Sequence, residues 1–124
     1  MKTLFLVLSF LFSFSVLAET DPKAAFAMAK EGKAVLVDVR EGPELKSGMI
    51  EGAEWFPMSK LESESNWKTQ FTAIAKDRVV FLYCRSGNRS GKVRTILKSN
   101  GIDSENLGGF ETLKEILPVT QPTK

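Results

Sequence analysis

Two continuous apolar segments constrain the fold of this chain more than any other feature of its sequence. Residues 34–39 and residues 79–83 are rich in Val, Leu, Phe and Tyr, and only Asp38 interrupts them. A strand with one face in water alternates apolar and polar side chains, whereas a strand covered on both faces does not. These two segments therefore predict parallel strands at the centre of a sheet.

Helical patterns flank these two segments. Asp21 and Pro22 suit the start of a short helix that ends near Gly32. Further helices are expected from residue 59 through 74, after the second apolar segment as far as residue 100, and over residues 110–117. Short strands are expected at residues 55–57 and 105–107. Strands that alternate with helices predict a single α/β domain with a mainly parallel central sheet and helices on both faces.

The first 18 residues match a secretory signal peptide. Lys2 precedes an uncharged, mainly apolar stretch from Leu4 to Leu17, and the small Ala18 suits a cleavage site. The stretch is shorter than the ~20 residues that a membrane-spanning helix needs. We therefore expect residues 1–18 to be removed and the mature protein to begin at Glu19 in the periplasm. We expect the folded domain to cover residues 19–117 and residues 118–124, with two prolines, to form a loose tail.

The charge balance limits the classes of partner. The chain has 17 Lys and Arg residues against 15 Asp and Glu, for a formal net charge of +2. This small value gives no electrostatic reason to expect nucleic acid, or a membrane once the signal peptide is removed. We expect a monomer.

The chain has one cysteine, Cys84, and no histidine. One cysteine cannot form a disulfide within the chain, and a lone cysteine is often an inert small apolar residue. The absence of histidine excludes Cys–His and Ser–His–Asp catalysis and leaves no ordinary zinc site. Any activation of Cys84 must therefore come from backbone amides, a helix terminus or nearby arginines.

The sequence around Cys84 favours a reactive thiol over an inert one. Cys84 directly follows the second apolar segment and opens the loop Cys84-Arg85-Ser86-Gly87-Asn88-Arg89-Ser90. Such a loop surrounds a thiol with N–H groups and positive charge, which lower its pKa. A thiol of pKa ~8.5 is only about 3% ionised at pH 7, whereas one of pKa ~6.5 is roughly 75% ionised. In an α/β sheet, ligands bind outside the carboxyl ends of the strands, which is where this loop lies.

Two segments together resemble the signatures of the rhodanese (sulfurtransferase) family. The first comprises Val35–Arg40, Glu44, Gly48–Ala53 and Pro57, and the second comprises Cys84–Ser90 followed by Leu107–Phe110. They occur in the family's order and spread from about Val35 to Leu113, nearly the whole domain.

The resemblance implies a persulfide enzyme that uses no cofactor or metal. The cysteine takes the outer sulfur of a small anionic donor such as thiosulfate and passes it to cyanide or a thiol. Carried onto this chain, Cys84 is the nucleophile, and the substrate-binding residues are Arg85, Ser86, Gly87, Asn88, Arg89 and Ser90. Arg85 or Arg89 would attract the donor and stabilise the leaving sulfite.

Asp38, Arg40 and Glu44 match the first signature, and we assign them a structural role. A carboxylate and an arginine at a strand end most often pair with each other or with loop backbone. An acid–base role for Asp38 is a weaker hypothesis, because sulfur transfer to a thiolate needs little proton movement. The chain departs from the family at Met49, where a histidine is usual, and at Phe110, where a tryptophan is frequent. We interpret both as packing changes.

Three alternatives remain open from the sequence. A phosphatase or arsenate reductase of related fold would need five residues between its cysteine and arginine, whereas four separate Cys84 from Arg89. A binding module that kept the fold without catalysis would be expected to lack Cys84. A persulfide carrier that loads once and delivers sulfur to a protein partner would need the same loop as an enzyme.

Overall fold

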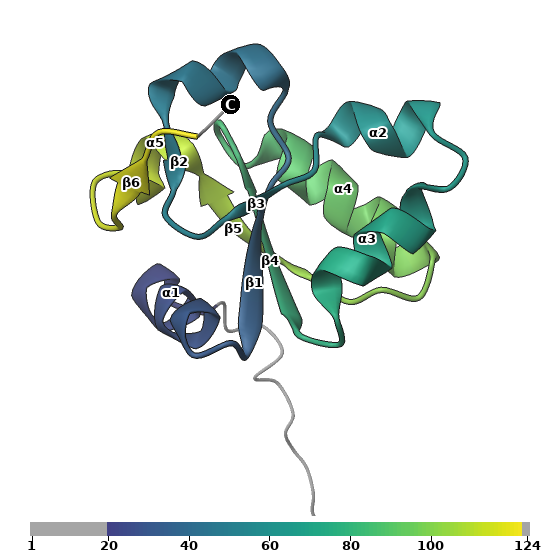
Figure 1. Ribbon diagram of the computed structural model, residues 1–124, viewed down its shortest axis with the longest axis horizontal. Coiled ribbons are helices and arrows are strands. Elements are labelled where there is room, and N and C mark those ends of the chain that lie inside the picture. The colour runs from purple at the N-terminus through teal and green to yellow at the C-terminus, as the bar shows by residue number, and fades with distance from the viewer. Residues whose placement is uncertain (1–19, 123–124) are drawn as a thin grey trace, which may run out of the picture.

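The computed structural model describes residues 20–122, which form a four-stranded parallel sheet with helices on both faces (Figure 1). The strands are β1 (Ala34–Asp38), β3 (Glu54–Trp55), β4 (Val79–Cys84) and β5 (Glu105–Gly109). Their order across the sheet is β3-β1-β4-β5. The two apolar segments are thus its central strands, and the predicted α/β class with a mainly parallel sheet is confirmed.

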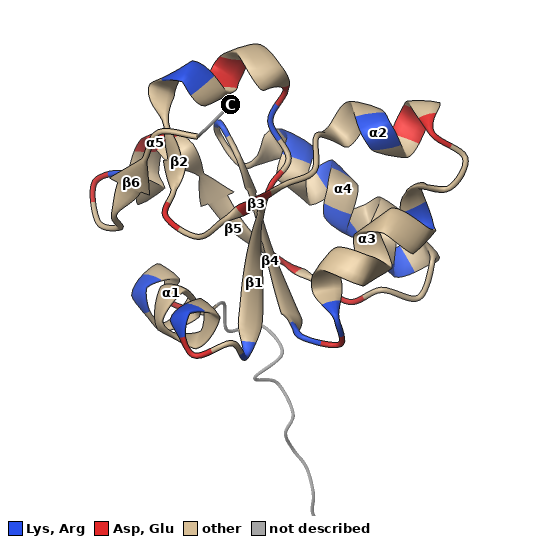
Figure 2. Ribbon diagram, viewed as in Figure 1, with Lys and Arg blue, Asp and Glu red and all other residues tan. Residues whose placement is uncertain are grey.

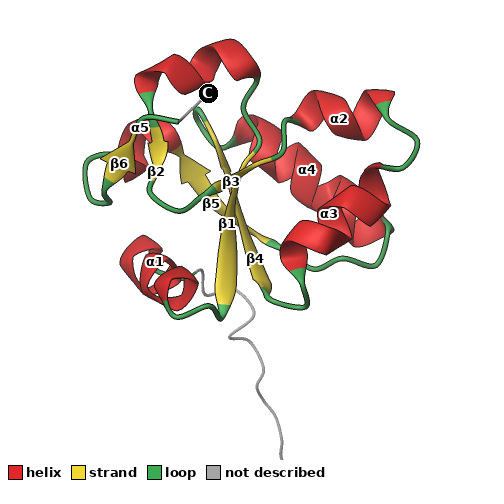
Figure 3. Cartoon of the chain, viewed as in Figure 1, coloured by secondary structure: helices red, strands yellow, loops and turns green. Residues whose placement is uncertain are grey.

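Within residues 20–122, five α-helices cover the sheet (Figure 3). α1 (Pro22–Lys30) and α5 (Phe110–Leu113) lie on one side, and α2 (Met58–Ser63), α3 (Trp67–Ala75) and α4 (Asn88–Ser99) lie on the other (Figure 1). The side chain of Asp21 caps α1 by accepting hydrogen bonds from the amides of Lys23 and Ala24. The helix therefore begins where the Asp-Pro pair predicts.

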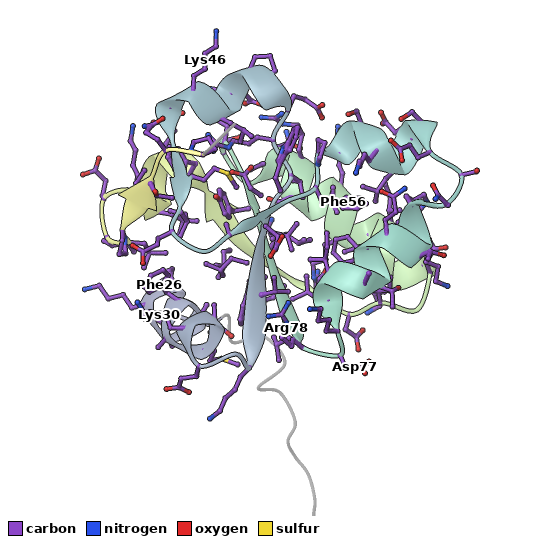
Figure 4. All side chains as sticks on the ribbon, viewed as in Figure 1. Phe26, Lys30, Lys46, Phe56, Asp77 and Arg78 are labelled. Carbon is purple, nitrogen blue, oxygen red and sulfur yellow. The ribbon has the colours of Figure 1, made fainter. Side chains whose placement is uncertain are left out.

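Alternate residues of β1 and β4 point into two separate hydrophobic cores. Val35 and Val37 of β1 pack toward α3 and α4, in the core where the Phe56 and Phe71 rings meet edge to face with their centroids 5.2 Å apart (Phe56 is labelled in Figure 4). Leu36 of β1 faces the opposite core with Phe81, beneath α1 and α5. Apart from the exposed Val79 at the start of β4, both faces of the central strands are buried, as their apolar pattern predicts.

The structure differs from the sequence-based expectations in three elements. The helix expected from residue 59 through 74 is divided into α2 and α3 by Glu64, whose extended backbone (φ −114°, ψ 120°) ends the first helix. α5 stops at Leu113, short of the expected end at residue 117. The sequence patterns did not indicate the 3₁₀ helix η2 (Gly42–Ser47), which lies between β1 and the short strand β2 (Met49–Ile50).

The first part of the segment expected to be a loose tail, residues 118–124, is ordered. Residues Val119–Thr120 form β6, which pairs with β2 in antiparallel register, Met49 opposite Thr120 and Ile50 opposite Val119. The start of the segment expected to be loose therefore joins the fold, because its backbone satisfies the hydrogen bonds of β2.

The proposed signal peptide, residues 1–18, lies outside the residues that the structure describes. Within residues 20–122, none of the helices has the length and apolar character needed to span a lipid bilayer.

Candidate active site

The carboxyl ends of the parallel strands bring the chemically distinctive residues to one edge of the sheet. Cys84 is the last residue of β4, and its register partner on β5 is Gly109. Asp38 ends the neighbouring strand β1. A loop of three residues then leads from Cys84 into α4, with Gly87 at the N-cap in a left-handed conformation (φ 99°). A residue with a side chain would be strained there, so the tight entry into α4 favours glycine.

The sulfur of Cys84 is surrounded by hydrogen-bond donors. The Gly87 amide lies 3.0 Å from Sγ, and the Ser90 amide lies 3.4 Å from it. The Ser90 hydroxyl is also 3.4 Å from Sγ. Both amides lie at the N-terminus of α4, Gly87 as its N-cap and Ser90 in its first turn, and the positive end of the helix favours an anion. The loop therefore provides converging donors for one negatively charged sulfur.

These donors lower the pKa of the thiol. Burial raises the pKa of Cys84, because a thiolate loses its hydration in the protein interior. The hydrogen bonds from the Ser90 hydroxyl and amide, and those from the Gly87 and Ser86 amides, lower the pKa by more. The net pKa of Cys84 is thus below the ordinary thiol value, so the inert-cysteine interpretation is disfavoured.

Two glycines of β5 allow the loop to lie directly against the sheet edge. A Cβ atom added to Gly109 would overlap the Arg85 carbonyl oxygen and lie 2.7 Å from the Ser86 Cα. A Cβ added to Gly87 would lie 3.3 Å from the Gly108 Cα. The loop and the Gly108-Gly109 pair are therefore in backbone contact, which fixes the loop amides around Sγ.

Arg89 is held by an acidic residue from a distant part of the chain. Its two terminal nitrogens donate to the two Glu44 carboxylate oxygens, each at 2.7 Å. The hydrogen bonds from Arg89 lower the pKa of Glu44 to about 2. Glu44 Oε1 also accepts from the Glu41 amide at 2.9 Å. The pair ties the first turn of α4 to η2, so the guanidinium of Arg89 is already engaged.

Arg85 differs from Arg89. Its side chain is exposed, and within residues 20–122 no carboxylate forms an ion pair with it. Ser86 and Asn88 are exposed beside it, whereas Ser90 is buried. The outer surface of the loop therefore presents one unpaired guanidinium.

Asp38 and Arg40 form a buried ion pair next to the loop. Arg40 Nη2 lies 2.7 Å from Asp38 Oδ2, and Arg40 Nε lies 3.0 Å from Asp38 Oδ1. Arg40 also donates to the Gly48 carbonyl at 2.6 Å, and its guanidinium lies 4.2 Å from the Phe110 ring centroid. Asp38 and Arg40 are 0% and 1% exposed, so they brace the sheet edge and have no surface for a substrate.

Asn106 on β5 makes polar contacts with the Cys84 loop and with α4, and the sequence patterns did not single it out. Its Nδ2 donates to the Gly87 carbonyl at 2.9 Å, and its Oδ1 lies 2.7 Å from the Ser90 hydroxyl. The only sign of it in the sequence was a polar side chain in a short strand, shortly before two glycines.

Met49 occupies the position where the family usually has histidine. It is 7% exposed and lies in β2, away from the loop contacts to Sγ.

Other features of the described residues do not compete with this site. An open cavity of about 910 Å³ lies between η2, β2 and residues 120–122, but no residue of the Cys84 loop lines it. Residues 20–122 contain no group of three His, Cys, Asp or Glu side chains placed to bind a metal ion. The Cys84 loop is therefore the candidate active site.

Comparisons of the whole chain with known proteins point to one family. A sequence model described as a Rhodanese-like domain matches residues 21–115. The uncharacterized protein YqhL of Bacillus subtilis is 41% identical over 81 residues, which are 64% of this chain and 60% of that protein. A sulfurtransferase of Allochromatium vinosum is 35% identical over 74 residues, 60% of this chain and 64% of that protein. The chain thus spans less than two thirds of the length of these curated relatives.

The fold has a close structural counterpart. The crystal structure of a rhodanese-related protein from Thermoplasma volcanium superimposes with a TM-score of 0.68 and 25% sequence identity. The match covers 84% of this chain and 98% of that one. The similarity therefore extends over most of this chain and nearly all of that protein.

Proposed function

The chain belongs to the rhodanese family, and from this membership we propose that it is a sulfurtransferase that carries sulfur as a Cys84 persulfide. The observation that carries the proposal is the ring of donors around Cys84 Sγ, formed by the Gly87 amide and by the amide and hydroxyl of Ser90. Donors that converge here stabilise a thiolate before the reaction, and the amides among them remain to stabilise an anionic persulfide after it.

The proposed reaction has two steps. The Cys84 thiolate attacks the outer sulfur of thiosulfate, so a new S–S bond forms while the bond to the sulfonate sulfur breaks. Sulfite leaves with the electron pair of the broken bond, and the enzyme holds Cys–S–S⁻. Cyanide or a thiolate then attacks the outer sulfur and takes it, which returns the Cys84 thiolate. Neither step requires Asp38 to give or take a proton. This agrees with the structure, where the Asp38 carboxylate forms an ion pair with Arg40.

The loop also suggests how an anionic donor reaches the sulfur. Cys84 is 0% exposed, so a donor can contact Sγ only when the groups that cover the sulfur move aside. Arg85 lies in the exposed part of the loop. α4 adds further positive charge, because it carries basic side chains and no acidic ones (Figure 2). An anion is therefore attracted to the mouth of the loop, with Arg85 as the residue that binds it.

The engagement of Arg89 argues against the phosphatase alternative. A phosphoryl group needs amides around three equatorial oxygens and an arginine that binds two of them. Here the two terminal nitrogens of Arg89, which would bind those oxygens, donate to the Glu44 carboxylate. The loop is also one residue too short for that class, so the proposal remains sulfur transfer.

Turnover with thiosulfate and cyanide tests the proposal. The wild-type protein should form thiocyanate repeatedly, and Cys84→Ser should fold but form none, since a hydroxyl cannot carry the persulfide. Aryl phosphates should not be hydrolysed. Sustained phosphate release without thiocyanate would replace the proposal with the phosphatase alternative.

A persulfide carrier gives a different result in the same assay. It would accept one sulfur per protein and release it once to cyanide, with no steady state. A burst of one equivalent followed by no further product would therefore identify a carrier, whereas many turnovers would identify an enzyme.

We also propose that the protein acts in the periplasm after removal of residues 1–18. The support is the basic, apolar and small-residue order at the start of the sequence. N-terminal sequencing of exported protein should give Glu19 as the first residue. Recovery of the chain with Met1 in a membrane fraction would contradict this proposal.

A further inference from the structure

The Ser90 hydroxyl has two possible acceptors on opposite sides. Cys84 Sγ lies 3.4 Å away, and Asn106 Oδ1 lies 2.7 Å away. A hydroxyl has one proton to donate, so a strong hydrogen bond to one acceptor weakens the bond to the other. The charge on Sγ is therefore linked to the direction in which Ser90 donates.

The orientation of the Asn106 amide is fixed by its other contacts. Its Oδ1 accepts from the Gly108 amide at 2.9 Å, and its Nδ2 donates to the Gly87 carbonyl at 2.9 Å. Exchanging the oxygen and nitrogen would place donor against donor and acceptor against acceptor. Oδ1 can only accept, so whenever the 2.7 Å hydrogen bond with Ser90 forms, the hydroxyl is its donor and that proton is not available to Sγ.

We propose that Asn106 is a positioning residue that competes with Cys84 Sγ for the Ser90 hydroxyl proton. When Sγ is an uncharged thiol, Ser90 donates to Asn106 and can itself accept from the thiol S–H. When Sγ becomes a thiolate, the Ser90 hydroxyl turns to donate to the sulfur. Asn106 thereby favours the uncharged sulfur and limits how strongly the loop acidifies the thiol.

The same competition has a consequence for sulfur transfer that rests on the proposed function. A persulfide carries its negative charge on the outer sulfur, so Sγ itself is uncharged. Ser90 then returns to Asn106, and the charged outer sulfur retains the loop amides as donors. Asn106 thus lowers the cost of moving the charge away from Sγ when the donor is attacked.

The ionisable groups around Cys84 stay the same if Asn106 is replaced by an apolar residue. They are Arg85 in the loop, Arg89 on α4 paired with Glu44 of η2, the Asp38–Arg40 pair after β1, Tyr83 on β4, and Glu111 on α5, which pairs with Lys114. A neutral substitution at residue 106 therefore changes the hydrogen bonding of Ser90 without changing the charge near Sγ.

The test is the pKa of Cys84 in the whole protein, measured from thiolate ultraviolet absorbance against pH. Cys84 is the only cysteine, and burial raises the pKa of Tyr83, the only tyrosine, well above its usual value, so neither residue type obscures the signal. Asn106→Leu should lower the pKa of Cys84 by about 0.5 to 1, the size expected when one hydrogen bond is strengthened. Ser90→Ala should raise it.

The double variant distinguishes competition from a scaffold role. In the Ser90→Ala background, Asn106→Leu should leave the pKa unchanged, since there is no hydroxyl for which to compete. If Asn106 only anchored the loop through Gly87, its loss would disorder the donors and raise the pKa in both backgrounds. A raised or unchanged pKa in Asn106→Leu overturns the proposal.

Asn106→Ala should lower the pKa of Cys84 in the same way. It replaces Asn106→Leu if leucine does not fit beside Gly91, where an added Cβ atom would lie 3.4 Å from the Asn106 amide nitrogen. The measurement involves no sulfur transfer. The proposal can therefore fail while the protein remains a sulfurtransferase, and it can hold if the protein proves to be a phosphatase.

Discussion

At the scale of single residues, the three arginines near Cys84 have different surroundings. Arg40 is buried against Asp38, Arg89 is engaged by Glu44, and Arg85 is exposed without a carboxylate partner within residues 20–122. An engaged guanidinium must break its ion pair before it can bind an anion, whereas a free one need not. We therefore expect Arg85 to bind the donor and Arg89 to position α4.

Arg85→Ala should raise the KM for thiosulfate about two- to fivefold with little change in kcat, the loss expected for one exposed charge contact. The difference from wild type should shrink at high ionic strength, because salt screens the attraction. Lys46→Ala is the control, since this lysine extends from η2 into solvent (Figure 4). An equal effect of both variants would indicate general charge attraction and no binding by Arg85.

Glu44 gives the fold a dependence on acid. Its pKa of about 2 lies below the ~4.3 of a free glutamate, so its charged form is favoured in the folded state. A depressed pKa contributes stability above the unfolded value that is lost as pH falls toward the folded value. Wild type should therefore lose more stability than Glu44→Gln between pH 5 and pH 2.5, measured as urea midpoints. Parallel losses in the two proteins would contradict this role of the ion pair.

The candidate nucleophile could be singled out from the sequence at this scale, but the contacts around it could not. Cys84 was marked by one cysteine, no histidine and the loop of Gly and Arg that follows it. The pairing of Arg89 with Glu44, 45 residues earlier, could not be read from the sequence because a guanidinium can bind many carboxylates. Asn106 was missed for a similar reason, since its partners are set by where β5 lies beside β4.

At the scale of elements, the contact between the loop and the end of β5 determines the shape of the site. Gly109→Ala should displace the loop, because its Cβ would overlap the Arg85 carbonyl oxygen. Gly109 has an ordinary backbone conformation (φ −119°, ψ 146°), so the effect is steric. We expect a loss of about 1–3 kcal/mol in the free energy of unfolding and a larger proportional loss of sulfur transfer.

Gly42→Ala is a matched control for this substitution. An added Cβ at Gly42 would lie 3.8 Å from the nearest atom, the Trp55 ring, which is ordinary van der Waals distance. Urea unfolding and thiocyanate formation should both stay close to wild type. Equal behaviour of the two alanine variants would show that the Gly109 contact does not hold the loop.

The elements most visible in the sequence were the long and strongly patterned ones. β1, β4, α1 and α4 follow from apolar runs and caps. The division between α2 and α3 and the β2–β6 pair were not predicted. Two-residue strands have no periodicity, and the place of β6 depends on a partner about 70 residues away in the sequence, so only the folded arrangement defines them.

At the scale of the whole molecule, each of the two cores supports a different part of the site. The core under α3 and α4 includes Val93 and positions the helix whose first turn donates to Sγ. The core under α1 and α5 includes Phe110 and supports the Gly108-Gly109 segment against the loop. Because β1 and β4 contribute side chains to both cores, the site is fixed from both faces of the sheet.

The central claim is that Cys84 carries a transferable sulfur atom, and intact-mass measurement tests it most directly. Reduced protein incubated with thiosulfate should gain the mass of one sulfur atom and lose it again when cyanide is added. Cys84→Ser, folded as judged by circular dichroism, should gain nothing. A wild-type protein that never gains this mass, or a Cys84→Ser protein that gains it as wild type does, would contradict the account.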